Sequence, residues 1–237
     1  MQRGRARILI DCGVDWLKAL KRISPTAIVL THAHRDHAFG LAKGAPCTVY
    51  ATDDTWSLIS RFPIGDCRTV KARELFAVDG VRFEAFPVEH SISAPAVGYR
   101  VTANEFSFFY VPDLAAICDQ REALRGVDLY VGDGATIIRS MVRSRDHALI
   151  GHTPIVAQLA WCENEGVDRA IFTHCGSAIV RVNVKMIEDR ISQLGADYGV
   201  ESRIAYDGHL DGVMRLGLLA KDMANEDDPH LTRMAAG

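Results

Sequence analysis

Three histidines and one aspartate fall within a single segment that reads Thr-His-Ala-His-Arg-Asp-His from residue 31 onward. The segment directly follows the apolar run Ala-Ile-Val-Leu, which predicts a strand. Side chains alternate along a strand, so His32 and His34 would point to the same side. A helical turn after the strand would bring Asp36 and His37 to a neighbouring point. Imidazole and carboxylate groups bind zinc, manganese or iron, so the segment indicates two metal ions side by side.

The other candidate site residues all lie just after an apolar run that predicts a strand, with at most two residues between the run and the candidate. These residues are Asp11, His90, Asp113, Asp133 and His174. The ends of strands can converge on one edge of a sheet, where loops carry chemistry on a rigid scaffold. We therefore expect these residues to meet the histidine segment.

Taken in order, these residues resemble the pattern of the metallo-β-lactamase superfamily, HxHxDH followed by His, Asp and His. The resemblance covers about residues 8 to 217 and implies an αββα sandwich of the metallo-β-lactamase type. It also implies a division of ligands: His32, His34 and His90 on one metal ion, Asp36, His37 and His174 on the other, and Asp113 bridging both. Asp11 matches the aspartate that supports the site without binding metal.

Within the superfamily, the sequence is most similar to tRNase Z and the phosphonate-pathway cyclic phosphodiesterases. His152 lies in Gly-His-Thr at the start of a predicted helix, 22 positions before His174, and those relatives place a histidine there near the substrate phosphate. Asp36 and His152 are therefore the catalytic candidates. Only ten residues precede Asp11, so we expect either a late start of the chain or the loss of the opening strand pair of relatives. The long arm of tRNase Z is absent, which argues against a tRNA substrate.

Arg139, Arg143 and Arg145 lie in the stretch 136–148, which we expect to be a loop. Two interpretations stay open: a solvated basic loop, or a clamp whose guanidinium groups bind phosphate oxygens. His147 in the same stretch is expected to be a polar surface residue. Asp133 and Asp207 are candidates to support the ligands, and His209 is a weak candidate beside them.

The hypothesis that the resemblance favours is a dinuclear hydrolase that cleaves a small or cyclic phosphodiester with a hydroxide shared by two metal ions. Zinc is the expected metal, with manganese or iron as alternatives. His152 would stabilise charge or protonate the leaving group, and the arginines would orient the phosphate. A second hypothesis keeps the metals but cleaves a thioester, lactone or other carbonyl ester. A third is an iron-dependent oxygenase, against which the complete second ligand set argues.

Composition is ordinary for a globular protein of 237 residues, with 48% hydrophobic and 24% charged residues. A net charge of −3 argues against bulk binding of nucleic acid. No apolar run is long enough to span a membrane, and the six widely spaced cysteines favour reduced thiols. We expect a cytoplasmic protein with a small phosphoester substrate, and a homodimer stays open.

Helical patterns occupy five stretches: 14–23, 38–43, 114–124, 153–165 and 183–194. Strands alternate with them, with antiparallel neighbours around residues 74 to 111. No linker divides the chain, so residues 1–220 are predicted to form one domain and 221–237 a mobile tail.

Overall fold

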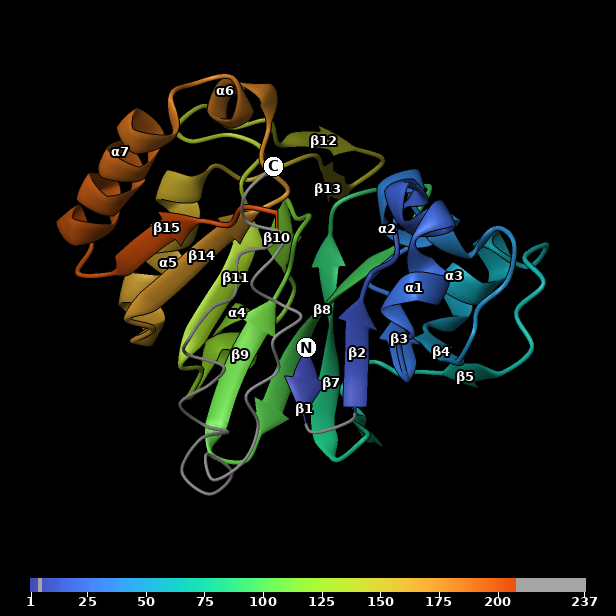
Figure 1. The fold of residues 1–237 in the computed structure, drawn as a ribbon. Helices are drawn as coiled ribbons and strands as arrows, with labels where there is room; N and C mark the ends of the chain where they lie inside the picture. Colours follow the sequence, from blue (N-terminus) through green and yellow to red (C-terminus); the bar gives the residue numbers. More distant parts are fainter. Residues whose placement is uncertain (4–5, 208–237) are drawn as a thin grey trace.

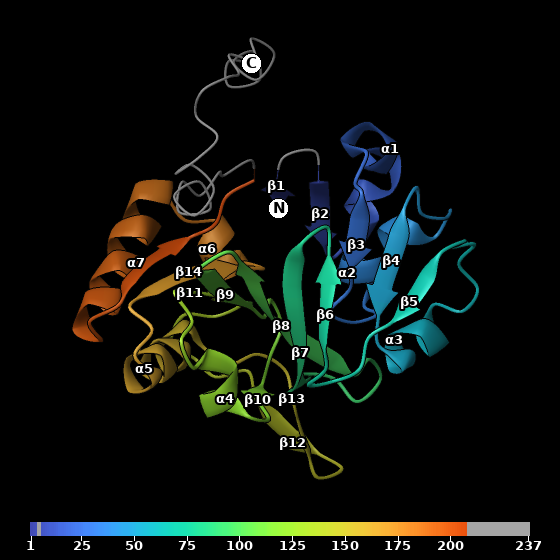
Figure 2. The same cartoon turned by 90° about the horizontal axis from the view of Figure 1, so that it is seen from below.

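Two β-sheets pack face to face, and helices cover the outer face of each, as Figure 1 shows for this computed structural model. The structure describes residues 1–3 and 6–207. Figure 2 shows the layers from below, with α5 and α7 beside one sheet and α1 and α3 beside the other. The αββα sandwich predicted from the sequence is confirmed.

The first sheet has five strands in chain order, parallel except for β1, which runs antiparallel to β2. Its strands are β1 (Gln2–Arg3), β2 (Ala6–Ile10), β3 (Ala27–Val29), β4 (Thr48–Ala51) and β5 (Cys67–Thr69). The outer layer contains η1 (Val14–Lys18), α1 (Leu20–Ile23), α2 (Arg35–Ala38), η2 (Phe39–Leu41) and α3 (Asp53–Leu58). Ile28, Leu30 and Leu41 are fully buried in the apolar cluster between this sheet and its helices.

The second sheet mixes antiparallel strands at one side with parallel strands at the other. Its order is β10 (Ala116–Ile117), β7 (Val81–Glu89), β8 (Ala96–Ala103), β9 (Phe106–Tyr110), β11 (Leu129–Asp133), β14 (Arg169–Thr173) and β15 (Glu201–Ile204), and β6 (Leu75–Val78) also pairs with β7. The helices on this side are α4 (Gln120–Leu124), α5 (Ile155–Glu165), α6 (Ser177–Val180) and α7 (Val184–Asp197). A separate hairpin joins β12 (Arg143–Arg145) to β13 (Ala148–Ile150).

The space between the sheets is filled by side chains that alternate along the strands. Phe83 and Tyr99 from the second sheet pack with Ile8 and Val29 from the first, and all four are almost completely buried. The Tyr99 hydroxyl donates a hydrogen bond of 2.9 Å to the carbonyl of Leu30. Since Leu30 directly precedes the histidine segment, this bond ties the segment to the opposite sheet.

Six strands finish at the same edge of the sandwich. β2 and β3 are parallel in the first sheet, and β9, β11 and β14 are parallel in the second. β7 runs in the same direction as β9 because both are antiparallel to β8. The predicted site residues therefore arrive at one edge, as the positions after the strands indicated.

Some predicted helices differ from the observed elements. The stretch 114–124 is helical only from Gln120, because Ala116 and Ile117 pair with the edge of β7. The stretch 14–23 divides into a 3-10 helix and a single α-helical turn. The α-helix expected at 38–43 is instead an α-helical turn at Arg35–Ala38 followed by a 3-10 helix at Phe39–Leu41. The sequence pattern missed α3, where the Thr52 hydroxyl caps the helix by accepting a hydrogen bond from the Thr55 amide.

The antiparallel strands predicted around residues 74 to 111 are confirmed. The predicted tail 221–237 and His209 lie outside the described residues, and the extent of the domain stays a prediction. None of the helices in the described part of the chain combines the length and apolar character needed to cross a membrane.

Candidate metal centre

The first group of ligands consists of three imidazoles and one carboxylate. His34 Nδ1 lies 3.0 Å from His32 Nε2 and 3.2 Å from His90 Nε2. Asp113 Oδ2 lies 3.4 Å from His32 Nε2 and 3.6 Å from His90 Nε2. One atom from each residue can therefore face a common point, which we call the first metal cluster. Its members come from the ends of β3, β7 and β9.

The opposite nitrogens of two of these rings fix which nitrogen faces the cluster. His90 Nδ1 lies 3.3 Å from the Gly151 carbonyl, which can only accept, so the proton is on Nδ1 and the lone pair on Nε2. His32 Nδ1 lies 3.0 Å from the Thr31 hydroxyl, which itself donates to Asp11. Both rings thus present an unprotonated Nε2 to the cluster, as metal ligands do.

The second metal cluster consists of Asp36, His37, Asp113 and His174. His37 Nε2 lies 3.0 Å from Asp113 Oδ2, and His174 Nε2 lies 3.1 Å from Asp36 Oδ2. His174 Nδ1 lies 2.7 Å from Asp113 Oδ1. Asp113 belongs to both clusters, so its position is that of a carboxylate shared between two ions.

Asp11 supports the second cluster from behind. Its Oδ2 accepts a hydrogen bond of 2.8 Å from His37 Nδ1, and its Oδ1 accepts one of 2.8 Å from the Thr31 amide. A carboxylate on the far nitrogen orients a histidine ligand and makes it more basic. The supporting role predicted for Asp11 agrees with this geometry, and Thr31 adds a hydroxyl that the sequence interpretation overlooked.

Three buried atoms at this point, His37 Nε2, Asp113 Oδ1 and His174 Nδ1, are in ion-pair contact with neighbouring site residues but form no hydrogen bond of standard geometry within the described chain. Buried polar atoms without hydrogen bonds are rare and destabilising. Nitrogen and oxygen donors in this arrangement suit divalent metal ions. The residues therefore fit two such ions, one at each cluster.

Ionisation divides the histidines into two kinds. Burial lowers the pKa of His90 to about 4, so this ring is neutral and ready to bind a cation. Burial opposes charge on His37 and His174 too, but neighbouring carboxylates outweigh it. Asp11 raises the pKa of His37 to about 12, and Asp113 raises the pKa of His174 to about 9. In the metal-free protein these two rings carry protons that compete with metal.

A hydrogen-bonded pair, His152 and Asp133, adjoins the two clusters. His152 Nδ1 lies 2.7 Å from Asp133 Oδ2 and 3.7 Å from Asp113 Oδ1. Atoms of Asp113, Asp133, His152 and His174 could by distance form a third ligand group. Because Asp133 already holds His152 Nδ1, the Nε2 atom of His152 is the one left for a substrate.

Asp133 is fully buried and its orientation is fixed by its surroundings. It accepts hydrogen bonds from the amides of Leu114 and Ala135 at 3.2 and 2.8 Å. The side chain of Gln158, also fully buried, bonds to both the amide and the carbonyl of Asp133 at 3.0 and 2.8 Å. Gln158 was not predicted, although a glutamine on the apolar face of a helix was a visible signal.

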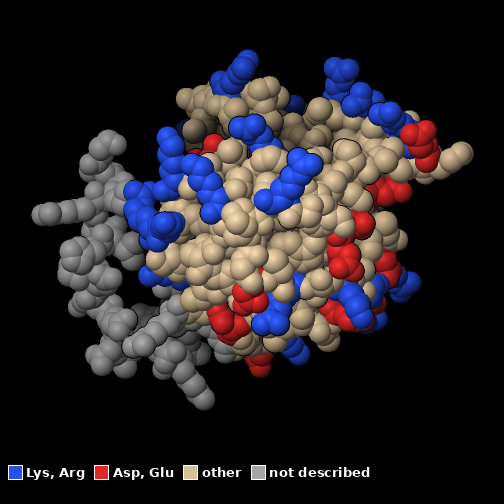
Figure 3. Space-filling model, turned by 90° about the vertical axis from the view of Figure 1, so that its right-hand side faces the viewer, with Lys and Arg blue, Asp and Glu red and all other residues tan. Residues whose placement is uncertain are grey.

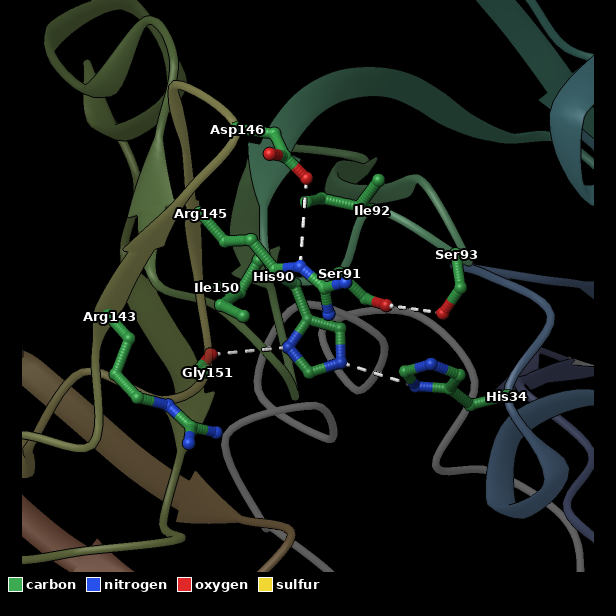
Figure 4. Close-up of a pocket in the computed structure, with 10 residues that line it drawn as sticks. All are labelled: His34, His90, Ser91, Ile92, Ser93, Arg143, Arg145, Asp146, Ile150 and Gly151. Atoms are coloured by element: carbon green, nitrogen blue, oxygen red, sulfur yellow. Dashed lines mark hydrogen bonds and ion pairs between the residues drawn. The ribbon is translucent and has the colours of Figure 1, made fainter.

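The predicted arginines line two different pockets. Arg139 and Arg143 line a pocket of about 700 Å³ that also contains His152. Arg143 and Arg145 line a pocket of about 410 Å³ beside His34 and His90 (Figure 4). The three guanidinium groups therefore do not form one clamp, and Arg143 is the one that both pockets share.

Residues 6–175 match the family described as the β-lactamase superfamily domain. The chain belongs to this family. No curated protein sequence gives a significant match.

Several solved structures share the metallo-β-lactamase fold of this superfamily member. A diphosphatase from the PhnP family is 24% identical to this chain, with a TM-score of 0.67. The matched region spans 88% of this chain and 80% of the diphosphatase chain. The short form of human tRNase Z is 18% identical over 75% and 85% of the two chains, with a TM-score of 0.54. An isothiocyanate hydrolase from Delia radicum gut bacteria is 16% identical over 80% and 77%, with a TM-score of 0.58. These activities differ, so the fold by itself does not choose the reaction.

Three predictions about individual residues need correction. His152 does not open a helix: α5 begins at Ile155, because Pro154 disfavours helical geometry in the residue before it. The stretch 136–148 is not all loop, since Arg143–Arg145 forms a strand. Asp207 is exposed just beyond the edge strand β15, and no hydrogen bond or ion pair joins it to the described site residues.

Proposed function

We propose that this superfamily member is a phosphodiesterase with two divalent metal ions. The observation that carries the proposal is the position of His152, beside both metal clusters and in one pocket with two arginines. A carbonyl ester needs no cationic pocket of this kind, whereas guanidinium groups bind phosphate oxygens well. A diphosphatase and tRNase Z among the proteins of this fold support the same choice.

The two clusters would hold the ions: the first through His32, His34 and His90, the second through Asp36, His37 and His174, with Asp113 shared. Such ions, when bound, lower the pKa of a coordinated water and polarise the phosphoryl oxygen. Zinc suits the nitrogen-rich first cluster, and manganese or iron would also be accepted by these donors.

His152 is placed to donate a proton to the leaving oxygen. The hydrogen bond from Nδ1 to Asp133 raises the pKa of His152 and favours its charged form near neutral pH. Asp133 also prevents rotation of the ring, so Nε2 stays directed away from Asp133. A general acid must lie within hydrogen-bond reach of the departing atom, which places the leaving group in the larger pocket.

Arg139 and Arg143 would bind the non-bridging oxygens of the phosphoryl group. Both side chains are exposed, and neither forms an ion pair or side-chain hydrogen bond with another described residue. Their charge is therefore not neutralised within the described part of the protein. Figure 3 shows that Lys and Arg side chains gather toward the upper part of one face, the end at which the strands carrying the site finish in Figure 1. Such a distribution attracts an anionic substrate.

The test compares the rates at which the protein, loaded with different metals, cleaves a phosphodiester and three carbonyl esters. Protein freed of metal and reloaded with zinc or manganese is assayed on bis(p-nitrophenyl) phosphate, p-nitrophenyl acetate, a lactone and a thioester. We expect a much higher kcat/KM for the phosphodiester, and a higher KM for it in the Arg139→Gln, Arg143→Gln double variant. Faster cleavage of the acetate, lactone or thioester, unaffected by the arginine changes, would instead identify a carbonyl ester hydrolase.

A further inference from the structure

The β12–β13 hairpin presents charged side chains on one face only. Arg143 and Arg145 are two positions apart on β12, so they point to the same side of the strand. The turn contains Asp146 and His147, both with positive φ values of 50° and 66°. Two consecutive left-handed residues give a tight turn that matches the twist of the strands. The two arginines are thus held by a short, well-defined element.

The hairpin is attached to the metal centre at its base. The Leu149 amide donates a hydrogen bond of 3.1 Å to Glu89 Oε2, and the Gly151 amide donates one of 2.9 Å to the His90 carbonyl. On the other side the Met141 amide donates one of 3.1 Å to the His152 carbonyl. The hairpin is therefore anchored both beside the first metal cluster and beside the proposed general acid, and the rings of His90 and His152 lie 5.2 Å apart, centroid to centroid.

Residues of the hairpin and its flanks line both pockets. Met141, Val142 and Arg143 face the larger pocket with His152, and Arg143, Arg145 and Ile150 face the smaller one with His90. Figure 4 shows Arg143 and Arg145 extending from the hairpin toward the His90 side, with Ile92 and Ser91 opposite. A third pocket, of about 190 Å³, lies at the second metal cluster and contains no arginine. A phosphodiester has two substituents on its phosphorus, and the two arginine-lined pockets meet at Arg143.

We propose that the smaller pocket binds the substituent that stays on phosphorus, and that this substituent carries its own negative charge. The inference rests on the proposed function, since a general acid at His152 sends the leaving group into the larger pocket. The retained group must then lie on the other side of Arg143, next to Arg145. The substrate class is a phosphodiester with a carboxylate or second phosphate on its retained alcohol.

The charges in the smaller pocket favour an anion. The only acidic side chain lining it within the described chain is Asp146, whose Oδ2 lies 3.6 Å from Arg145 Nε in an exposed ion pair. Asp146 is the one acidic partner of Arg145 within the described chain, and this exposed guanidinium can also donate two hydrogen bonds to a bidentate anion. Arg143 has no ion-pair partner within the described chain. Ile92 and Ile150 supply apolar contact for the carbon chain between the phosphorus and that anion.

The experiment keeps the leaving group constant and changes only the retained group. The zinc-loaded protein is given p-nitrophenyl ethyl phosphate and p-nitrophenyl 2-carboxyethyl phosphate. We expect kcat/KM to be higher for the carboxyethyl ester by about 10-fold or more, the contribution of one hydrogen bond to a charged group. In Arg145→Gln the ratio of the two values should fall to about one, as expected when that bond is lost. Arg61→Gln, an exposed arginine outside the pockets, is the matched control and should keep the ratio.

A second comparison tests which pocket holds which group. Met141→Ala should change the preference between p-nitrophenyl and 1-naphthyl leaving groups while keeping the preference for the carboxyethyl ester. An unchanged ratio in Arg145→Gln, or equal kcat/KM for the two esters in the native protein, would overturn the assignment of the smaller pocket.

A measurement of ligand binding tests the anion pocket independently of the proposed phosphodiesterase activity. Isothermal titration of the zinc-loaded protein with 2-carboxyethyl phosphate and with ethyl phosphate needs no hydrolysis. If neither diester is cleaved, the proposed function fails. The anion pocket still stands if 2-carboxyethyl phosphate binds more tightly and Arg145→Gln abolishes the difference, and equal affinities overturn it.

Discussion

The two nitrogens of His152 have separate tasks, one on Asp133 and one facing the substrate pocket. We predict that His152→Ala retains both metal ions, because the Nδ1 atom is already bonded to Asp133. For a diester with a poor leaving group, kcat should fall by about 10²–10⁴, the usual contribution of a positioned acid. The loss should shrink as the leaving group becomes more acidic. Metal analysis and kcat across a series of aryl leaving groups are the measurements.

Asp133→Asn is the companion variant, because it preserves shape while removing the charge that holds the His152 proton. Like His152→Ala, this variant should have a lower kcat. The pH profile of kcat should also shift toward lower pH, because the pKa of His152 falls when the Asp133 carboxylate is removed. Loss of metal from His152→Ala would make this residue a ligand, and an unchanged kcat on poor leaving groups would remove it from the mechanism.

The protons on His37 and His174 give metal binding a definite pH dependence. Both rings are protonated at neutral pH in the metal-free protein, with pKa values of about 12 and about 9. A metal ion must displace these protons, so affinity is lowest at low pH and rises as the pH approaches and passes 9. The apparent affinity should rise by about tenfold per pH unit for each displaced proton.

Competition with a chelator of known pH dependence, at several values between pH 6.5 and pH 9, measures this slope. Proton release on zinc binding can be followed independently in weakly buffered solution. Affinity that is flat or falls over this range would show that neither ring carries a displaceable proton.

At the scale of elements, α2 packs directly against the loop after β2. The second metal cluster depends on this close packing, because α2 carries two of its ligands, Asp36 and His37. A Cβ atom on Gly13 would overlap the Asp36 carbonyl oxygen, which no structure tolerates without movement. The Cys12 amide donates to the His37 carbonyl at 2.6 Å, so loop and helix are joined along their backbones. Any side chain at position 13 must push this helix away.

We predict that Gly13→Ala weakens metal binding at the second cluster, which contains Asp36 and His37, more than at the first. Stability should also fall, by about 1–3 kcal/mol, as is usual for a group forced into a packed site. Gly65→Ala is the matched control, because a Cβ there would meet nothing within 4 Å. Metal titration and urea unfolding of both variants provide the comparison, and equal behaviour of the two would contradict the close-approach argument.

Across the molecule as a whole, the metal centre joins the two halves of the sandwich. Asp36 and His37 belong to the first half, whereas His90, Asp113 and His174 follow strands of the second sheet. Metal ions bound between them would stabilise the folded state only, by about 2.7 kcal/mol at a free metal concentration 100 times Kd. Unfolding therefore reports on the integrity of the centre.

We predict two ions per chain and a lower Tm after their removal with a chelator, by about 5–10 °C for a protein of this size. Adding two equivalents of zinc should restore the Tm. Asp113→Ala should lose both ions or bind them poorly, because this carboxylate faces both clusters, whereas the exposed Asp197→Ala should match the native protein. Saturation at one ion per chain in elemental analysis would rule out the dinuclear centre.

The candidate ligands and the edge at which they meet could be predicted from the amino-acid sequence alone. Strand patterns depend on local alternation, and the types His and Asp carry metal chemistry wherever they are brought together. The sequence therefore indicated the positions of Asp113 after β9 and His174 after β14. The sequence pattern was less reliable for helices: Pro154 moved the start of α5, part of 114–124 pairs with β7, and α3 was missed.

The surroundings of those ligands depend on tertiary packing. The division of the three arginines between two pockets follows from a hairpin fixed by Glu89 and His90, about sixty positions earlier in the chain. The support of Asp133 by Gln158 and the exclusion of Asp207 are likewise set by packing between distant segments. Contacts between segments so far apart are governed by three-dimensional packing, and no local pattern of residue types encodes them.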